Sequence, residues 1–425
     1  MTEESHCIYT FGYEFVTNSG SHDIIGPRTS PLRLLAPLGC ALLALASIQA
    51  ASPSPQLALG TEKAPETLAS SLENLGRVYQ SKDNPFVQEF WLLGRYHGHY
   101  HWTDGSTGRY NDGFEDRRFR IGFHGKFFNK LTLHAQMVSG SDFDPFYNGF
   151  TELWAQWSFS DALNLTVGQQ KHRFTHDRNV SSRYLNYMER SMLTNMFALD
   201  YTPAVTLSGK FGRWNYYTGL FSNATGTSMG NAFTKLNSGW SYIASITYDL
   251  QKSLHTDTAH LNLSYLYSEA KTSATNMNRF NHGISAALML TEGSASLVTE
   301  ATAGVGGTRG SAYGINFQPG YYLTDKLQVV ARYQYAMAEQ ANGLQAQRRY
   351  ERTVGLNRGD VYQAGYLGLN YEIAAHRLKL MTGVEYASIG GQQSWTGWAG
   401  VRLFWGPHSK GPFPMAQSLP GAFGD

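Results

Sequence analysis

The chain has 425 residues, and its 34 Lys and Arg against 32 Asp and Glu give a formal net charge of only +2. So mild a balance excludes a protein that binds nucleic acid through a strongly basic surface. Both cysteines, Cys7 and Cys40, lie within residues 1–50, so the rest of the chain can form neither a disulfide framework nor a thiolate metal site.

Residues 1–50 are predicted to be a leader that contains a signal peptide. Arg28 and Arg33 precede the short apolar run Leu34–Ala46, and small residues before Ala51 suit cleavage. Removal of the leader takes away two basic and four acidic residues, so 32 basic and 28 acidic side chains remain, a net charge of +4. That excess is compatible with an anion preference if it is concentrated on one face.

We expect residues 51–86 to form a periplasmic N-terminal segment. Leu68, Leu72 and Leu75 are spaced as on one face of a helix, which predicts a short amphipathic helix within Ala64–Gln80.

The remainder has no apolar run long enough to cross a bilayer as a helix, yet it is rich in aromatic residues and glycine. An exported chain of this kind belongs to one of two classes. One is a soluble β-sandwich or β-helix protein, and the other is an outer-membrane β-barrel, whose strands show weak alternation over about ten residues.

The first two predicted strands have one apolar, aromatic face and one basic face. In Val87–Trp102, Arg95 and the histidines at 97, 99 and 101 share one face, because side chains alternate along a strand. In Glu115–Lys126, Arg118, Arg120 and Lys126 share one face. The same alternation places Arg117 on the opposite face.

Sixteen strands are predicted in all, an even number as in single-chain bacterial barrels. The others are 131–137, 152–159, 163–170, 202–211, 214–222, 241–250, 260–270, 282–291, 295–304, 312–323, 327–338, 361–372, 377–387 and 396–405.

The connectors between these strands alternate in length. Long ones are expected at 103–114, 140–150, 171–201, 223–240, 271–281, 305–311, 339–360 and 388–395, and only 251–259 is long for a turn. Outer-membrane barrels have tight periplasmic turns and longer outer loops. We therefore predict a transmembrane antiparallel β-barrel over residues 87–405, with a periplasmic tail at 406–425.

The third long connector, Lys171–Leu199, is the most basic segment between two strands. Its basic residues are Lys171, His172, Arg173, Arg178, Arg183 and Arg190. Only Asp177 and Glu189 oppose them. We expect this loop to fold into a water-filled barrel and to set what passes.

Several short pieces between residues 90 and 200 together resemble the phosphate-selective porin O and P family. They are Gly94-Arg95, the pair Arg117-Arg118 followed by alternating aromatics that end at Gly125, the strand end at Gly168, Ser181-Ser182-Arg183, and Met188-Glu189-Arg190. The resemblance implies a sixteen-stranded trimeric porin of the outer membrane. Its third outer loop folds inward, and basic side chains of the wall and of that loop bind and pass small anions.

The resemblance places Arg95, Arg117, Arg118, Arg178, Arg183 and Arg190 in the lumen or the constriction. Together with alternation and the basic loop, the predicted anion-binding residues are Arg95, Arg118, Arg120, Lys126, Lys171, Arg173, Arg178, Arg183 and Arg190. The chain departs from the family pattern because its seventh to tenth strands offer little beyond Arg213 and Lys271. Small anions are therefore the predicted partners, with phosphate one of them, and no cofactor is expected.

Three other interpretations remain. The histidines at 97, 99 and 101 have a spacing that lets two of them reach one metal ion, but we favour a polar wall whose positive charge rises below neutral pH. Trp91, Trp154 and Tyr147 suit a pore for neutral sugars. An outer-membrane hydrolase is the third, and its nearest grouping, Ser181-Ser182 with His176, lacks a partner that would orient the base.

Overall fold

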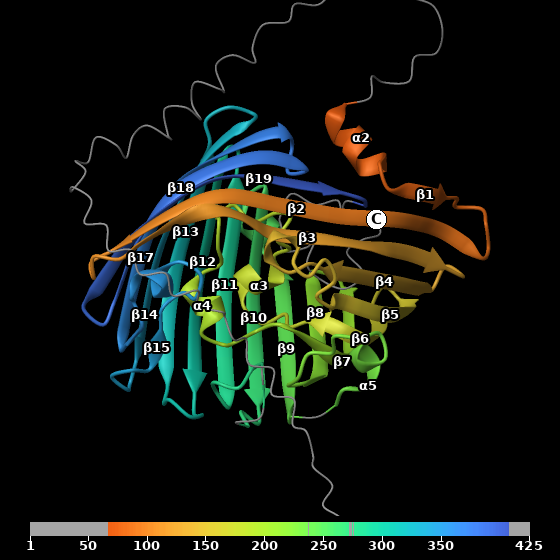
Figure 1. Cartoon of the computed structure of the whole chain (residues 1–425). Helices are drawn as coiled ribbons and strands as arrows, with labels where there is room; N and C mark the ends of the chain where they lie inside the picture. Colours follow the sequence, from red (N-terminus) through yellow and green to blue (C-terminus); the bar gives the residue numbers. More distant parts are fainter. Residues whose placement is uncertain (1–66, 237, 272–273, 275, 408–425) are drawn as a thin grey trace, which may run out of the picture. The chain divides into compact units, whose positions relative to one another are not determined.

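The computed structural model describes residues 67–407 except 237, 272–273 and 275, and most of this part is antiparallel β-structure (Figure 1). Sixteen strands pair with their neighbours in chain order, and β19 pairs with β2 to close the ring. Their bounds are β2 Val87–Gly105, β3 Tyr110–Phe127, β4 Leu131–Val138, β5 Phe150–Ser160, β6 Leu163–Lys171, β7 Tyr201–Phe211, β8 Trp214–Ser222, β9 Trp240–Asp249, β10 Thr258–Ser268, β11 His282–Glu292, β12 Ala295–Val305, β13 Ala312–Tyr322, β14 Leu327–Ala338, β17 Val361–Ala374, β18 Leu378–Ile389 and β19 Gln392–Trp405. The predicted sixteen-stranded barrel is confirmed.

Every strand separates two kinds of side chain, and β14 is representative. Gln328, Arg332 and Gln334 are buried on the face toward the interior of the ring, whereas Tyr333 and Met337 on the opposite face are exposed. A closed ring leaves no unpaired strand edge, so the backbone polar groups of the strands are paired within the sheet. The outward face can therefore be apolar over its whole height. Among the described residues, no helix combines the length and the hydropathy needed to cross a bilayer.

The N-terminal segment differs from its prediction. Helix α2 covers only Leu68–Asn74, and Arg77–Gln80 is strand β1, which pairs with the beginning of β2. Gly76 separates the two elements. A Cβ atom there would lie 1.7 Å from the carbonyl oxygen of Leu92, so only glycine lets the chain approach β2 this closely. The predicted leader, residues 1–50, and almost all of the predicted tail lie outside the described residues.

Two connectors also differ from expectation. Residues 103–114 do not form a long loop, because β2 and β3 continue as a pair to Gly105 and Tyr110 and leave a four-residue turn. Polar residues of this extension, such as Thr103 and Asn111, face the interior, and their polarity resembles that of a loop. The turn near 251–259 is long because it contains helix α6, Gln251–Leu254.

A β-bulge in β3 decides which side chains of that strand face the interior. His97 pairs with Arg118 and Gly98 pairs with Asp116, so Arg117 has no partner residue on β2. The extra residue resets the alternation, as bulges do. Arg117 and Arg118 both contact Glu189 of the loop inside the ring. The prediction that Arg117 faces outward is therefore wrong.

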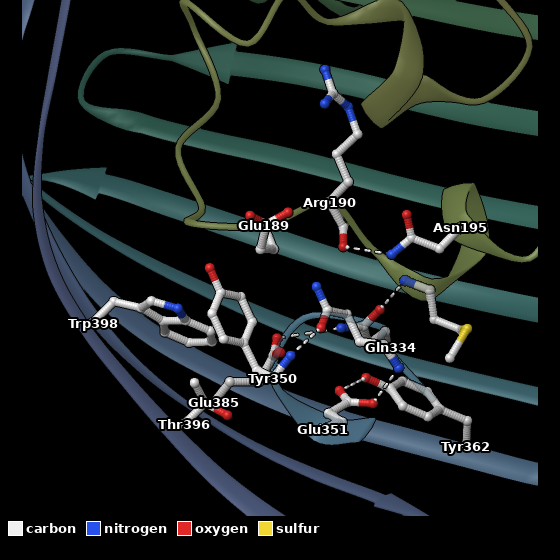
Figure 2. A pocket seen from close by; sticks show the side chains of 12 residues that line it. Glu189, Arg190, Asn195, Gln334, Tyr350, Glu351, Tyr362, Glu385, Thr396 and Trp398 are labelled. Atoms are coloured by element: carbon white, nitrogen blue, oxygen red, sulfur yellow. Dashed lines mark hydrogen bonds between the residues drawn. The ribbon is translucent and has the colours of Figure 1, made fainter. Parts of the chain in front are cut away.

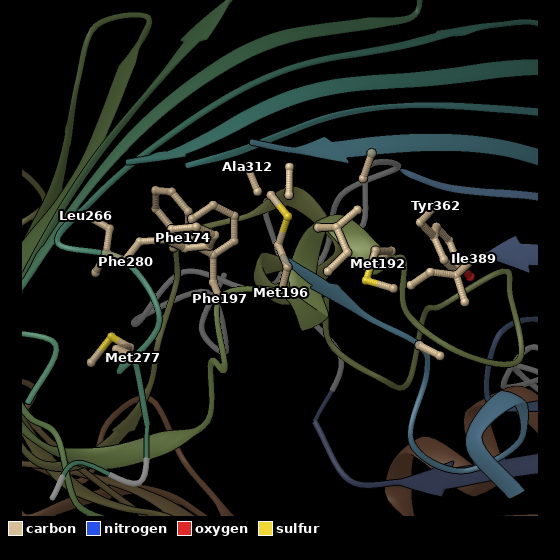
Figure 3. Close-up of a cluster of buried hydrophobic side chains, with 14 of the residues drawn as sticks. Phe174, Met192, Met196, Phe197, Leu266, Met277, Phe280, Ala312, Tyr362 and Ile389 are labelled. Atoms are coloured by element: carbon tan, nitrogen blue, oxygen red, sulfur yellow. The ribbon is translucent and has the colours of Figure 1, made fainter. Parts of the chain in front are cut away.

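Three loops pack together on the interior side of the strands (Figure 3). Loop 172–200 contains α3 His176–Asn179 and α4 Met192–Asn195, and loop 339–360 contains β15 Leu344–Gln345, η3 Glu351–Val354 and β16 Arg358–Gly359. Loop 269–281 lies between β10 and β11. The remaining short elements are η2 Ser141–Phe143 and α5 Asn231–Thr234.

The contact between these loops is an apolar cluster of its own. Phe197 lies 4.8 Å from Phe174 and 5.1 Å from Phe280 between ring centroids, so aromatic rings of two loops meet. Glycines of the wall leave room for them, since a Cβ at Gly304 would lie 2.6 Å from the Phe280 ring. Met192, Met196, Met277, Leu344, Val354 and Leu356 complete the loop side of the cluster.

Replacement of Phe280 by alanine should loosen the three loops without opening the barrel. The cavity left by a buried phenyl ring costs about 3–5 kcal/mol, and this cost falls on loop packing rather than on the strand ladder. Limited proteolysis should then cleave within the loops while the β-sheet circular dichroism signal persists. Phe317→Ala, at an exposed position of β13, is the matched control. Equal protease resistance of both variants would contradict the packing role.

Candidate functional site

Loop 172–200 is held against strands on the far side of the ring by its own backbone carbonyls. The Leu185 carbonyl accepts hydrogen bonds from Lys379 Nζ at 2.8 Å and from Arg402 at 2.9 Å. Arg402 also donates to the carbonyls of residues 187 and 188, and Arg332 donates to that of Glu189 at 2.9 Å. The loop starts at β6, whereas these cations belong to β14, β18 and β19. Buried carbonyls need donors, and charged donors make the stronger bonds.

Carboxylates of the loop add ion pairs to this anchoring. Glu189 lies 2.6 Å from Arg117 and 3.9 Å from Arg118, and Asp177 lies 3.8 Å from Arg332. Burial by itself opposes ionisation of Glu189, but the charges of the two arginines outweigh it and hold the pKa of Glu189 well below its usual range. Both arginines therefore stabilise the charged form of the loop carboxylate.

Arg190 was predicted to bind anions, but in the structure its guanidinium is engaged by the loop itself. Its guanidinium donates to the Asp177 carbonyl at 2.8 Å and to the Val180 carbonyl at 3.2 Å. Lys171 likewise donates to the carbonyls of Asn179 and Val180. Both side chains therefore stabilise the conformation of the loop. Part of the set of residues predicted to bind anions thus has a structural role.

On the side where the loop leaves and rejoins the wall, three arginines approach one another. Arg95 of β2 donates to Ser182 Oγ of the loop at 2.7 Å and to Gln136 of β4 at 3.0 Å. Arg120 of β3 donates to the Tyr201 hydroxyl at 3.1 Å, and the Arg178 guanidinium lies 4.6 Å from the centre of that same ring. Arg178 also pairs with Asp200 at 3.6 Å.

The other residues predicted to bind anions lie in three different environments. Arg173 is buried, and its Nη1 has no hydrogen-bond partner among the described residues. Arg183 donates to the Pro407 carbonyl at 3.2 Å and packs on the Phe404 ring, which ties the loop to the end of β19. Lys126 pairs with Glu89 across the strands at the far end of β3. It is therefore not brought together with the other basic residues.

We call the buried cations of this region, with Lys171 included for its charge, the basic cluster. They are Arg95, Arg120, Lys171, Arg173, Arg178 and Arg183, all 9% exposed or less. Glu152 of β5 faces Arg95, Lys171 and Arg173, and Asp200 is largely exposed. Nε atoms of Arg95, Arg120 and Arg178 are buried without a hydrogen-bond partner in the described part of the chain. Unused charged donors and a positive excess are the chemistry of an anion site.

Arg332, Lys379 and Arg402 are absent from the sequence-based expectations. Each occupies an inward position of its strand, and alternation along β14, β18 and β19 was sufficient to find it. Glu385, which pairs with Arg332 at 2.9 Å, follows the same alternation on β18. These residues are the anchors of the loop rather than members of the basic cluster.

Two cavities border loop 172–200. One, with about 330 Å³ of empty space, lies between loops 172–200 and 339–360 and is lined by Glu189, Arg190, Tyr350, Glu351 and Glu385 among others (Figure 2). The other, with about 850 Å³, lies between the loop and the short turn at Gly293-Ser294.

Glu351, at the first cavity, is a buried carboxyl group with a shifted pKa. It accepts hydrogen bonds from the Tyr362 hydroxyl and from the Gln347 backbone, each at 2.7 Å. Burial, and then the nearby charge of Glu385, raise the pKa of Glu351 to about 7. Loop 339–360 therefore holds a proton that an unfolded loop would release at a lower pH.

Packing of loop 339–360 should weaken as the pH rises through about 7. A carboxyl whose folded pKa is raised contributes its full stability below the unfolded value of about 4.3 and loses it as pH passes the folded value. Hydrogen exchange of residues 339–360 should be faster at mildly alkaline than at mildly acidic pH, beyond its intrinsic pH dependence. Glu351→Gln should abolish this extra difference, and Glu339→Gln, at an exposed position of the same loop, should keep it. An unchanged difference in Glu351→Gln would refute the assignment.

Comparison with known proteins agrees with this architecture. The chain matches the family model described as phosphate-selective porin O and P over residues 90–382, more than half of its length. Its fold is similar to that of OmpF from Salmonella typhi in complex with daunomycin, with 11% identity, a TM-score of 0.54, and 77% of this chain and 100% of the other covered. OprB from Pseudomonas putida, in its high-pH structure, is similar with 12% identity, a TM-score of 0.51, and coverage of 74% and 94%. No curated protein sequence matches the chain.

At such low sequence identity the similarity to these structures shows only the fold. The match to the family model shows which family the chain belongs to. The resemblance inferred from residues 90–200 is thus confirmed and extends through the later strands. The chain belongs to the phosphate-selective porin O and P family and is a β-barrel porin of the outer membrane.

Proposed function

We propose that this porin passes small anions by passive diffusion and that the basic cluster beside loop 172–200 is its constriction. The observation that carries the proposal is the excess of buried positive charge where loop and wall meet. Six cations face one another there, with Glu152 as the carboxylate among them. An anion that enters would lower the electrostatic energy of this group, whereas a cation would raise it.

The arrangement suits passage rather than tight capture. Several guanidinium groups of moderate attraction lie along a short path from Arg178 and Arg183 on the loop to Arg95 and Arg120 on the wall. Conduction needs sites that bind well enough to admit the ion and weakly enough to release it. The planar donor pairs of arginine match the oxygens of phosphate, sulfate and carboxylates. Phosphate is therefore the first anion to test, and the family description supports the choice.

Assembly as a homotrimer is part of the same proposal, because the family resemblance implies it. We further propose that residues 1–50 are a cleaved leader, that residues 51–86 and 406–425 are periplasmic, and that the barrel of residues 87–405 is the part that conducts.

The neutral-sugar pore is the second candidate, and the structure offers it less support. Trp154 is buried against His134, with 5.0 Å between the ring centroids, and Trp91 is also buried. Tyr147 is exposed in a connector, where its hydroxyl donates to the Thr227 carbonyl. These three rings therefore form no shared stacking surface.

A hydrolase has still less support. The Ser182 hydroxyl accepts a hydrogen bond from Arg95, an environment that provides no general base. Residues 226–230 have the Gly-x-Ser-x-Gly spacing of a nucleophile elbow, a match absent from the sequence-based expectations. Ser228 there accepts a hydrogen bond from the Asn231 amide in a surface loop, outside the strand-to-helix turn that the motif requires.

Charge removal at the basic cluster should reduce anion selectivity. In the double variant Arg120→Gln/Arg178→Gln, the anion-to-cation permeability ratio should fall about tenfold, which corresponds to a loss of about 1.4 kcal/mol of anion stabilisation. Reversal potentials in a salt gradient measure this ratio. Lys126→Gln, which removes a charge from the same strand away from the cluster, should change it little.

Single-channel recordings with phosphate, sulfate and maltose as blockers identify the solute class. Block by the two anions that weakens in Arg183→Ala would support the proposal. A cation preference of the unmodified protein, or block by maltose alone, would reject it in favour of the sugar pore.

Neutralisation of the loop carboxylate should act in the opposite direction. Glu189→Gln leaves Arg117 and Arg118 without their counter-charge, so the anion-to-cation permeability ratio should rise, by roughly two- to tenfold. The same reversal-potential measurement detects the rise. Glu292→Gln, at the exposed end of β11, is the control. A fall in the ratio for Glu189→Gln would contradict the assigned pairing.

A further inference from the structure

A second cluster of chemically active side chains lies at the outer ends of β2 and β3, apart from the basic cluster. His99 and His101 are two residues apart on β2 and therefore share a face. Glu115 is the direct cross-strand partner of His99. One potential ligand atom from each of the three residues lies within 4.8 Å of the other two. This grouping was not apparent from the sequence, which suggested only histidines.

The β-bulge at Arg117 brings the carboxylate into this group. Strict alternation from Arg118 would place Glu115 on the outward face, and the extra residue turns it toward the interior beside His99. The partner of His101 is Gly113, where an added Cβ would meet only the His101 ring, at 4.0 Å. Gly113 therefore puts no side chain against that ring, and the Tyr350 ring lies 5.0 Å from it between centroids.

The hydrogen bonding of His101 leaves the lone pair of one ring nitrogen available to a metal ion. Its Nε2 lies 3.0 Å from the Asn111 side-chain oxygen, an acceptor, so Nε2 carries the hydrogen. Nδ1 then has the lone pair, and it is buried without a hydrogen-bond partner among the described residues. Metal-binding histidines are typically oriented in this way, with the second nitrogen donating to a neighbouring oxygen.

We propose that His99, His101 and Glu115 bind a divalent transition-metal ion of the Zn²⁺ type. Two imidazoles and one carboxylate are ligands that Zn²⁺, Ni²⁺ and Cu²⁺ accept. In a tetrahedral site with Zn–N bonds of about 2.0–2.1 Å, ligand atoms lie roughly 3.4 Å apart. His99 Nε2 and Glu115 Oε2 are already 3.5 Å apart. A fourth position remains for water or a small anion.

Loop 339–360 competes with the metal for two of these ligands. The Tyr350 hydroxyl lies 2.8 Å from His99 Nε2 and 3.3 Å from Glu115 Oε2, and Arg349 forms a close ion pair with Glu115 Oε1. A nitrogen that coordinates the metal no longer bonds to Tyr350, so metal binding releases this contact between loop and wall. The inference does not depend on which solute the pore passes.

The test is a titration of the full-length, untagged and chelator-treated protein in detergent. Zn²⁺ binding measured by calorimetry and Co²⁺ binding measured by visible absorption should each show one equivalent. His99→Gln, His101→Gln and Glu115→Gln should each weaken binding at least about tenfold, because loss even of a residue that only orients a ligand costs about that much. His97→Gln removes another histidine from the same face of β2, where it lies 3.5 Å from Arg118, and should bind like the unmodified protein.

Arg349→Gln separates loss of a ligand from loss of the fold. It removes a competing positive charge from Glu115, so Zn²⁺ should bind more tightly, by roughly tenfold, whereas a misfolded variant would bind less. Affinity that is unchanged in the three ligand variants, or reduced equally in His97→Gln, would overturn the site. Affinity that is unchanged in Arg349→Gln would overturn the competition with loop 339–360.

Discussion

The site depends on one kind of interaction, in which arginine and lysine side chains of the wall donate to backbone carbonyls of loop 172–200. A loop inside a barrel has no neighbouring strand with which to pair, so its buried carbonyls require other donors. Arg332, Lys379 and Arg402 supply them from three strands on the far side of the ring. These charged donors hold residues 185–189 of the loop against the wall. Arg178 and Arg183 of the same loop are thereby held opposite the wall arginines.

The basic residues of this chain consequently divide into two groups with different energetics. Arg332 and Arg117 each face a carboxylate, and their burial is compensated by ion pairs. The basic cluster has like charges close together with few counter-charges, an arrangement that destabilises an empty protein. The first group stabilises the fold that holds the second group in place. In the proposed constriction an anion would relieve this repulsion, so the cluster would exchange folding stability for selectivity.

Much of the fold could be predicted from the sequence because a barrel strand has a period of two and repeats sixteen times. Arg95 and Arg120 were correctly assigned to the interior for that reason. Alternation gave the wrong face for Arg117 because a bulge inserts one extra residue into the strand and so reverses the faces of the residues beyond it. Nothing in the amino-acid composition reveals a bulge. Residues 103–114 were taken for a loop because inward-facing Thr103 and Asn111 are as polar as loop residues. The role of Lys171 depends on carbonyls eight and nine residues away in the chain, a relation that only tertiary structure reveals.

The bulge at Arg117 also makes insertions and deletions more consequential here than substitutions. Loss of this one residue would restore the regular count of β3, and the side chains between Tyr110 and Asp116 would exchange faces. Glu115 would then project toward lipid, where a carboxylate is costly, while Phe114, now exposed on the outside, would turn to the water-filled side. The chemistry of the outer mouth thus rests on the number of residues in one strand as much as on their identity.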